Sequence, residues 1–133
     1  MRFQLTYAGI QVRDIERSLA FYRDILVMRV VRRAWEPETK GEWVELRSPG
    51  SRLLLEHNWY PEGSKFFAGP YRRGDALDHI AFHCEDVEGA YRELLAKGVR
   101  SAHPPFMEGG SLLAFVQDPD GIWIELTGPA ASS

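Results

Sequence analysis

Two stretches of the chain alternate apolar and polar residues and then change to an amphipathic helical pattern. The first is "YAGIQVRDIERSLAFYRDIL", which begins at Tyr7, and the second is "HIAFHCEDVEGAYRELLAKG", which begins at His79. An aspartate, Asp14 or Asp86, stands in each where a helix N-cap is expected. Apolar residues then recur every three to four positions, as on one helix face. These residues are Ile15, Leu19, Tyr22 and Leu26 in the first stretch and Val87, Ala90, Tyr91 and Leu94 in the second. The pattern predicts a strand followed by a helix, twice, with Gly98 ending the second helix.

The two stretches are related by a constant offset, which indicates an internal repeat. His79 aligns with Tyr7, and Asp86 aligns with Asp14, both at 72 residues (79 − 7 and 86 − 14). Both copies also close with a turn signal and an apolar strand, "SPGSRLLLE" and "DPDGIWIE". We therefore expect Glu56 and Glu125, near the ends of these strands, to be equivalent positions.

Two further strand candidates lie between the helix and the last strand of each copy. They cover residues 28–34 and 42–47 in the first copy and 99–102 and 112–117 in the second. The unit is βαβββ, used twice. The predicted fold class is α+β, with two tandem βαβββ modules forming a curved, cup-like mixed β-sheet and the helices outside. We expect a single domain over residues 1–133, with module 1 at about 1–59, a Pro- and Gly-rich linker at about 60–75 and module 2 at about 76–128.

Side-chain alternation assigns the two faces of the predicted sheets. Apolar residues of the first strands should pack under the helices; they are Ile10, Val12, Ile80 and Phe82. Tyr7 and His79 lie on the opposite, helix-free faces, where Glu56 and Glu125 also belong. Polar groups among apolar ones on a helix-free face are typical of a concave binding site.

The composition is that of an ordinary soluble globular protein, with 133 residues, 44% hydrophobic and 26% charged. A net charge of −3 without a long basic run argues against nucleic acid or an anionic membrane as partner. No stretch resembles a signal peptide or reaches membrane-spanning length, so we expect a cytoplasmic protein. Cys84 is the single cysteine, which excludes an internal disulfide and a CxxC metal motif.

Glu125 interrupts an apolar strand, where a lone carboxylate costs several kcal/mol to desolvate unless a cation pairs with it. Pseudo-twofold packing of the modules would bring Tyr7, Glu56, His79 and Glu125 together. One imidazole and two carboxylates can hold one divalent metal ion such as Ni, Zn, Mn, Co or Fe. We therefore predict a metal site at Glu56, His79 and Glu125, with Tyr7 at a fourth position.

Four motifs resemble the vicinal oxygen chelate superfamily, and within it glyoxalase I and its relatives: "VRDIERSLAFYRDIL", "LLLEHNWYPEGSKF", "LDHIAF" and "DPDGIWIEL". The resemblance covers nearly the whole chain. It implies paired βαβββ modules around a metal, a small-molecule substrate and a homodimer. In glyoxalase I each module supplies a His and a Glu ligand, and the motif match places Glu56, His79 and Glu125 at three of these positions.

The chain departs from the family pattern at two places. Tyr7 stands where the family usually has the first ligand His, and Val27 stands where relatives commonly have glycine. A neutral phenol, with a pKa near 10, is a poor ligand. Tyr7 therefore binds metal as a phenolate, leaves its position to water, or marks a site that works without metal. We favour the second interpretation.

The resemblance implies a glyoxalase I-like lyase or isomerase that acts on a small α-oxo or hemithioacetal substrate through an enediolate. A glutamate would remove a carbon-bound proton while the metal stabilises the developing charge. We favour Glu125 over Glu56 as this base, because its module keeps both expected ligand types, and we expect His79 to be a ligand only. Three alternatives stay open. They are a metal-free, antibiotic-binding protein of the bleomycin-resistance type, an extradiol-type dioxygenase, which needs two His and one carboxylate, and an epimerase of acyl thioesters.

Several candidate groups also have structural interpretations. Glu56 could pair with Arg52 across the pleat. His57 points away from Glu56 and is expected to be structural or solvent-exposed, His83 to be a polar lining residue, and His103 to lie in a loop. Cys84 is expected to be a small buried side chain. The apolar residues that could line a pocket or belong to the core are Phe106, Met107 and Trp123.

Overall fold

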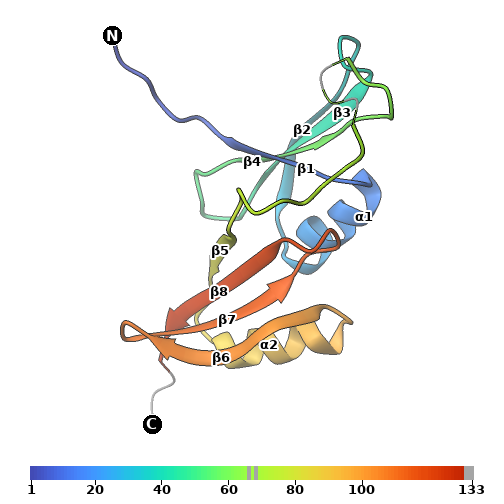
Figure 1. Cartoon of the computed structure of the whole chain (residues 1–133). Helices are drawn as coiled ribbons and strands as arrows, with labels where there is room; N and C mark the ends of the chain where they lie inside the picture. Colours follow the sequence, from blue (N-terminus) through green and yellow to red (C-terminus); the bar gives the residue numbers. More distant parts are fainter. Residues whose placement is uncertain (66, 68, 131–133) are drawn as a thin grey trace. The chain divides into compact units, whose positions relative to one another are not determined.

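The computed structural model describes residues 1–65, 67 and 69–130 (Figure 1). The chain divides into two compact units, residues 1–72 and residues 73 onward, which we call the N-terminal unit and the C-terminal unit. Each unit is a βαβββ module with its own four-stranded mixed sheet. The α+β class and the two tandem modules are therefore as the sequence predicts. The predicted linker includes residues 66 and 68, which lie outside the described residues.

The N-terminal unit contains four strands and one irregular helix. Its elements are β1 (Ala8–Gln11), α1 (Ile15–Leu19), η1 (Ala20–Ile25), β2 (Arg29–Glu36), β3 (Gly41–Arg47) and β4 (Leu55–Trp59). The strand order is β1-β4-β3-β2, in which β1 and β4 are parallel and the other pairs are antiparallel.

The C-terminal unit repeats this plan. Its elements are β5 (Ile80–His83), α2 (Val87–Ala96), β6 (Arg100–Glu108), β7 (Ser111–Gln117) and β8 (Trp123–Pro129). The strand order is β5-β8-β7-β6, again with the first pair parallel and the others antiparallel. The two sheets therefore share one topology, which is the structural form of the sequence repeat.

Both helices begin at the predicted aspartates. The Asp14 carboxylate accepts a hydrogen bond from the Arg17 backbone N–H at 2.9 Å, and Asp86 accepts one from Gly89 at the same distance. Each bond satisfies an amide that the first helical turn leaves without a backbone partner. Gly98, with a φ of 86°, follows the C-cap of α2 as predicted.

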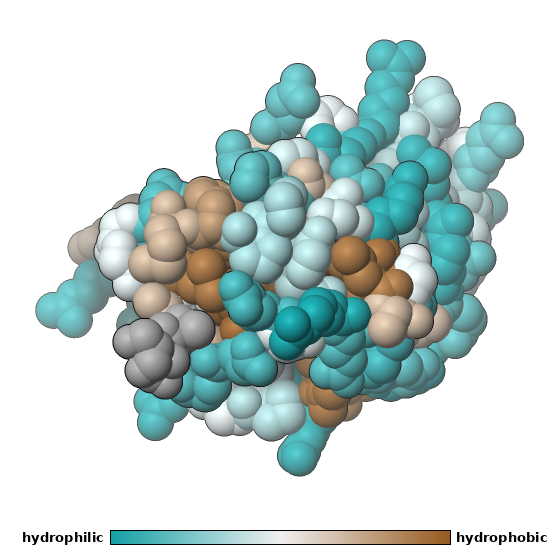
Figure 2. Space-filling view, turned by 90° about the horizontal axis from the view of Figure 1, so that it is seen from below, coloured by the Kyte–Doolittle hydropathy of each residue, from teal (hydrophilic) through white to brown (hydrophobic). Residues whose placement is uncertain are grey.

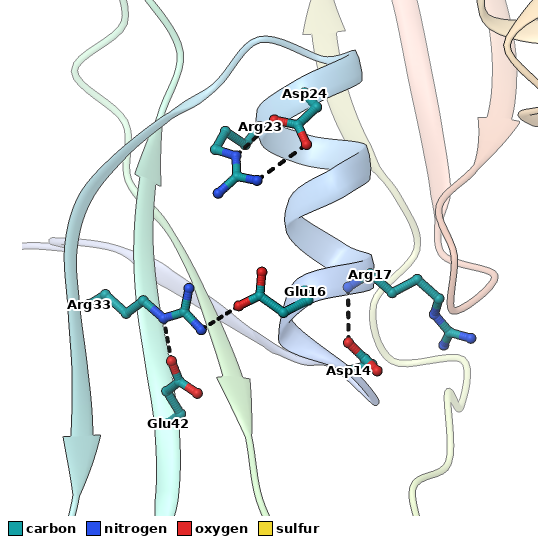
Figure 3. Close-up of polar contacts among 7 residues, drawn as sticks. All are labelled: Asp14, Glu16, Arg17, Arg23, Asp24, Arg33 and Glu42. Atoms are coloured by element: carbon teal, nitrogen blue, oxygen red, sulfur yellow. Dashed lines mark hydrogen bonds and ion pairs between the residues drawn. The ribbon is translucent and has the colours of Figure 1, made fainter.

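Arg33 ties the first helix to the sheet of the N-terminal unit (Figure 3). Its Nη2 donates to Glu16 of α1 at 2.7 Å, and its Nε donates to Glu42 of β3. Arg33 is paired with Val44 in the β2–β3 register, and Val44 is fully buried. This ion-pair cluster therefore lies on the helix side of the sheet, away from the helix-free face.

The first helix departs from the predicted pattern after Leu19, where it continues as the π-helix η1. The Leu26 backbone N–H donates to the Phe21 carbonyl at 2.9 Å, five residues earlier. The wider turn brings the adjacent side chains of Phe21 and Tyr22 into the core, whereas Leu26 is only half-buried. The predicted single apolar face is therefore wrong in its last turn.

Val27 ends this helix in a strained conformation. Its φ is 61°, in the left-handed region, and its side chain is exposed. That region costs an L-residue roughly 1–2 kcal/mol, whereas glycine enters it freely at an entropic cost of about 0.5–1 kcal/mol. We expect Val27→Gly to raise the free energy of unfolding by about 1 kcal/mol in urea titrations. Val27→Ala, which keeps a Cβ, should gain less; a glycine variant no more stable than the alanine variant would contradict this explanation.

Most strands extend beyond their predicted bounds, and three of them change where a candidate residue lies. β4 runs from Leu55 to Trp59, so Glu56 lies at its start rather than near its end, because the antiparallel register with β3 continues to Trp59. β8 likewise continues past Glu125 and ends at Pro129, which is paired with Ser111 of β7. β6 includes His103, so the expected loop position of this residue is wrong. This edge strand accommodates its two prolines through register shifts on either side of His103.

Each sheet has one face covered by its helix. In the C-terminal unit α2 packs against β6, β7 and β8 (Figure 1). In β8 the buried Ile124 and Leu126 alternate with the more exposed Trp123, Glu125 and Thr127. The opposite face is therefore free of helix, as predicted.

The outer surface matches the composition. On the face seen in Figure 2, hydrophilic side chains predominate and apolar side chains form separate patches. None of the described helices is long and apolar enough to span a membrane.

Candidate functional site

The strand registers place the two predicted glutamates at equivalent positions. Glu56 is paired with Gly9 in the parallel β1–β4 ladder, and Glu125 is paired with Ala81 in the parallel β5–β8 ladder. Tyr7 and His79 precede Gly9 and Ala81 by two residues each. Because side chains two residues apart share a face, each unit presents one glutamate together with one of these two residues on its helix-free side.

In the C-terminal unit, His79 and Glu125 face each other. The distance from His79 Nε2 to Glu125 Oε1 is 3.7 Å, and the Glu125 side chain is only 15% exposed. On the other side of the ring, His79 Nδ1–H donates to the Asp78 carboxylate at 2.6 Å. A proton held at Nδ1 leaves the Nε2 lone pair directed at the Glu125 side, as in imidazoles that bind metals.

Aromatic rings surround this pair. Phe115 lies opposite Glu125 in the β7–β8 register and contacts the His79 ring edge-to-face at 5.7 Å. Trp123 and Phe106 contact Phe115 at 5.3 and 6.3 Å between ring centroids. Trp123 and Phe106 therefore belong to the helix-free face and shelter Glu125, rather than filling the core under α2.

In the N-terminal unit, Tyr7 and Glu56 line a pocket of about 570 Å³. Trp43, Glu45 and Tyr60 line it as well. Burial raises the pKa of Glu56; a hydrogen bond from Asn58 opposes this shift, and the neighbouring Glu45 carboxylate adds to it. Glu56 is therefore a partly desolvated carboxylate beside a second carboxylate, a setting that a bound cation would stabilise.

Glu45, not Glu56, has the arginine partner in this pocket. Glu45 is 5% exposed, lies directly opposite Glu56 across β3 and β4, and accepts a hydrogen bond from Arg32 Nε at 2.7 Å. The Arg32 guanidinium also lies 5.6 Å from the centre of the Trp43 ring. The alternative Arg52–Glu56 pair is not among the ion pairs between described residues, and Arg52 is exposed.

The other histidines and Cys84 lie outside these two groups. His57 is fully buried in the core, which rejects the solvent-exposed alternative; its Nδ1 is 2.8 Å from Ser18 Oγ. The His83 side chain is exposed, and its Nε2 lies 3.1 Å from Oε1 of Glu85. His103 Nδ1 donates to the Pro104 carbonyl. Cys84 is half-buried, and burial raises the pKa of its thiol, so it is not an activated nucleophile.

The predicted ligands thus form two pairs, one in each unit. No group of three or more His, Cys, Asp or Glu able to hold a metal occurs within the part of the chain that the structure describes. The donor types nevertheless fit a borderline divalent ion. The Nε2 atom of His79 points toward Glu125, the Glu125 side chain is largely buried, and Glu56 is partly desolvated.

Arg32, Glu45 and Tyr60 are among the residues of the N-terminal pocket that sequence reasoning did not assign to the site. Arg32 and Glu45 were overlooked because their pairing depends on the β2–β3 register. Tyr60 was assigned to the linker. The alternation of Trp43, Glu45 and Arg47 in "EWVELR" was the available signal for Glu45.

The turn before β8 is held by the buried carboxylate of Asp118, and it leads into the strand that carries Glu125. Asp118 is 2% exposed, and its Oδ1 accepts hydrogen bonds from the backbone N–H groups of Asp120 and Ile122, both at 2.8 Å. We expect Asp118→Ala to lower the free energy of unfolding by about 2–3 kcal/mol, because it leaves two amides unsatisfied. Asp118→Asn keeps an acceptor oxygen and should cost clearly less in urea titrations. An alanine variant as stable as the asparagine variant would show that these bonds contribute little.

Comparison with known proteins places these observations in a family context. A family model described as the Glyoxalase/Bleomycin resistance protein/Dioxygenase superfamily matches residues 4–126. Lactoylglutathione lyase of Haemophilus influenzae is 31% identical over 128 residues, which cover 92% of this chain and 90% of that protein.

Solved structures give the same picture. The trypanothione-dependent glyoxalase I of Leishmania major is 31% identical, with a TM-score of 0.76 over 95% of this chain and 87% of that one. The V278E variant of maize glyoxalase I is 26% identical, with a TM-score of 0.79 over 96% of this chain. This chain spans 45% of the maize chain, so it is just under half its length.

Proposed function

Because this chain belongs to the Glyoxalase/Bleomycin resistance protein/Dioxygenase superfamily, we propose that it is a glyoxalase I-like, metal-dependent lyase or isomerase. Its substrate would be a small α-oxo compound, taken as the hemithioacetal that it forms with a thiol. The observation that carries the proposal is the contact of His79 Nε2 with the sheltered Glu125 carboxylate. The relatives named lactoylglutathione lyase support the same reaction class.

We assign the metal-holding role to Glu56, His79 and Glu125. The bound divalent ion (Ni, Zn, Mn, Co or Fe) would polarise the substrate oxygens and stabilise negative charge on them. Asp78 holds the proton of His79 at Nδ1 and so keeps the Nε2 lone pair available. The aromatic rings of Phe115 and Trp123 limit water around Glu125, which strengthens electrostatic interactions there.

The proposed reaction moves a proton between adjacent carbons. In the hemithioacetal, Glu125 removes the proton from the carbon that bears sulfur and hydroxyl. The electron pair of that C–H bond forms a carbon–carbon double bond, and the carbonyl electrons move onto oxygen to give the enediolate. Glu125 then returns the proton to the neighbouring carbon, which yields a hydroxyacyl thioester. Glu56, whose pKa is raised by burial, is the alternative base.

Tyr7 argues against one alternative function found in the superfamily and is compatible with another. An extradiol-type dioxygenase needs two His and one carboxylate on iron, and Tyr7 occupies the position of one of those His. A metal-free binding protein needs no ligand at this position. The pocket of about 570 Å³ beside Tyr7, with Trp43 and Tyr60 in its wall, favours this second candidate. We include in the proposal the homodimer that the family resemblance implies and the cytoplasmic location that the sequence pattern predicts.

Turnover of methylglyoxal tests the proposed function. Protein incubated with each divalent metal is mixed with methylglyoxal and a series of thiols, and thioester formation is followed by ultraviolet absorbance. We expect metal-dependent turnover with at least one thiol, at about 1–10³ per second. Absence of turnover in every combination would contradict the proposal and favour the binding protein.

A further inference from the structure

We propose that a row of aromatic rings beside Glu125 binds the substituent of the α-oxo substrate, and that this substituent is an aryl group. The row consists of Phe106, Phe115 and Trp123, which come from three neighbouring strands of the C-terminal sheet. Phe106 is its specificity-determining residue. The inference rests on the proposed function and deepens it, because it names the class of substrate for the same site.

All three rings lie on the helix-free face that carries Glu125. Phe115 is the direct neighbour of Glu125 in the β7–β8 register, and Trp123 precedes Glu125 by two residues in β8. Phe106 is paired with Leu113, which precedes Phe115 by two residues in β7. Since side chains two residues apart share a face, one continuous surface joins the rings to the carboxylate. Every one of these groups belongs to the C-terminal unit.

The rings contact one another at the distances that aromatic pairs prefer. The centroids of Phe106 and Phe115 lie 6.3 Å apart with an angle of 22° between the ring planes, and those of Phe115 and Trp123 lie 5.3 Å apart. On the edge strand β6 the row is extended by His103, whose ring centroid lies 4.6 Å from that of Phe106. A further ring placed on the row can form face and edge contacts with its members, and such contacts stabilise aromatic pairs beyond the burial of apolar surface.

The row is open to a ligand. Trp123 is 36% exposed, and Phe106 and Phe115 are half-buried. Leu113, which shares their face, is only 7% exposed, so the surface between the rings is closed. The aromatic side chains therefore keep apolar surface in contact with water above a closed floor. An apolar group that covered this surface would be stabilised by the hydrophobic effect.

The place of the row beside Glu125 fits the substituent of the proposed substrate. Glu125 removes the proton of the carbon that bears sulfur, and the substituent is attached to the neighbouring carbonyl carbon. It therefore lies next to the reacting carbon, over Phe115, which is opposite Glu125 in register and contacts the His79 ring at 5.7 Å. A methyl group is too short to reach from Phe115 to Phe106, whereas a phenyl group can contact both rings. The row therefore selects an aryl substituent.

The ratio of kcat/KM for phenylglyoxal to that for methylglyoxal tests the inference. The metal-loaded protein is assayed with each aldehyde and the same thiol, at equal concentrations of the hemithioacetal. We expect the wild type to favour phenylglyoxal by at least about 10-fold. Phe106→Ala should lose most of this preference, while its kcat/KM for methylglyoxal stays within about twofold of the wild type. The matched control is Met107→Ala, the next position of β6, where the 55% exposed side chain lies on the opposite face; it should keep the wild-type ratio.

A binding measurement separates this inference from the proposed function, because it needs no turnover. Isothermal titration calorimetry, with and without added metal, compares benzoylformate with pyruvate, two α-oxo acids that differ only in a phenyl or a methyl substituent. We expect benzoylformate to bind the wild type at least about 10-fold more tightly than pyruvate, and Phe106→Ala to abolish the difference. Phe106→Leu, which keeps an apolar side chain without a ring, should give an intermediate ratio.

Each outcome bears on one of the two proposals. A wild type that turns over both aldehydes with equal kcat/KM would overturn the inference and leave the proposed function intact. A folded Phe106→Ala variant that keeps the wild-type ratio, or loses activity with both aldehydes alike, would also overturn the inference. A wild type that is inactive with every thiol and metal, yet binds benzoylformate more tightly through Phe106, would overturn the proposed function and support the aryl site. Thermal unfolding of each variant checks that the fold is retained.

Discussion

Replacing Glu125 by glutamine should lower kcat by about 10³- to 10⁴-fold at saturating metal. Glutamine keeps the size of the side chain and an oxygen donor, but it cannot accept the carbon-bound proton, and a general base contributes up to about this factor. The position suits the role, since Glu125 is sheltered by aromatic rings and lies 3.7 Å from His79 Nε2. The measurement is a steady-state comparison of wild type and Glu125→Gln with the active thiol.

Two controls sharpen this test. Glu85→Gln changes an exposed glutamate that contacts His83 and should leave kcat unchanged. Glu56→Gln removes the other candidate base, and we expect a smaller loss of kcat at saturating metal. If Glu56→Gln loses more activity than Glu125→Gln, the base role belongs to Glu56. A Glu125→Gln variant that keeps a tenth of the wild-type kcat would contradict the assignment.

Acid should destabilise the protein through His57 by about 3 kcal/mol. Burial lowers the pKa of His57 to about 4 in the folded protein, whereas an unfolded histidine has a pKa near 6.5. Between these values the unfolded chain binds a proton that the folded chain rejects. The contribution to stability is therefore complete above pH 6.5 and is lost as pH falls toward 4, at about 1.4 kcal/mol per pH unit.

The surroundings of His57 explain this intolerance of charge. The centroids of the His57 and Tyr22 rings lie 4.5 Å apart in an edge-on arrangement, and the His57 ring shares a hydrogen bond with Ser18. The buried Nε2 of His57 has no hydrogen-bond partner among the described residues. A protonated ring would thus carry a buried charge with one donor unsatisfied.

Urea titrations from pH 7.5 to pH 4 measure this effect. His57→Leu should be less stable than the wild type at pH 7.5, because it leaves the Ser18 hydroxyl without its partner. The free energy of unfolding of this variant should, however, fall less steeply as the pH is lowered from 6.5 to 4. The difference in slope from the wild type should correspond to the uptake of about one proton on unfolding. Parallel pH profiles for the two proteins would show that His57 is not the group that titrates.

The repeat and the helix-free faces could be predicted from the sequence because they depend on local patterns. Alternation of side chains fixes the faces of each strand, and the aspartate caps fix the helix starts. The equivalence of Glu56 and Glu125 followed from the turn and apolar strand that close each copy, and the matching β1–β4 and β5–β8 registers confirm it.

What could not be predicted depends on contacts between distant segments. The Arg32–Glu45 pair follows from the hairpin register after a bulge in β2, which the sequence pattern does not reveal. The burial of His57 depends on Ser18 and Tyr22, which the α1–η1 segment places over β4. The π-turn itself costs regular helical hydrogen bonding and is compensated by packing Phe21 and Tyr22 together.

Metal content per chain is the most direct test of the central claim, that Glu56 and His79 hold a catalytic ion. The wild type, Glu56→Ala and His79→Ala are purified without a metal-affinity step and incubated with Ni, Zn, Mn, Co or Fe(II). After removal of excess ion, elemental analysis counts the metal retained. We predict about one equivalent in the wild type and loss of it in both variants. A wild type that retains no metal, or variants that retain as much as the wild type, would contradict the assignment.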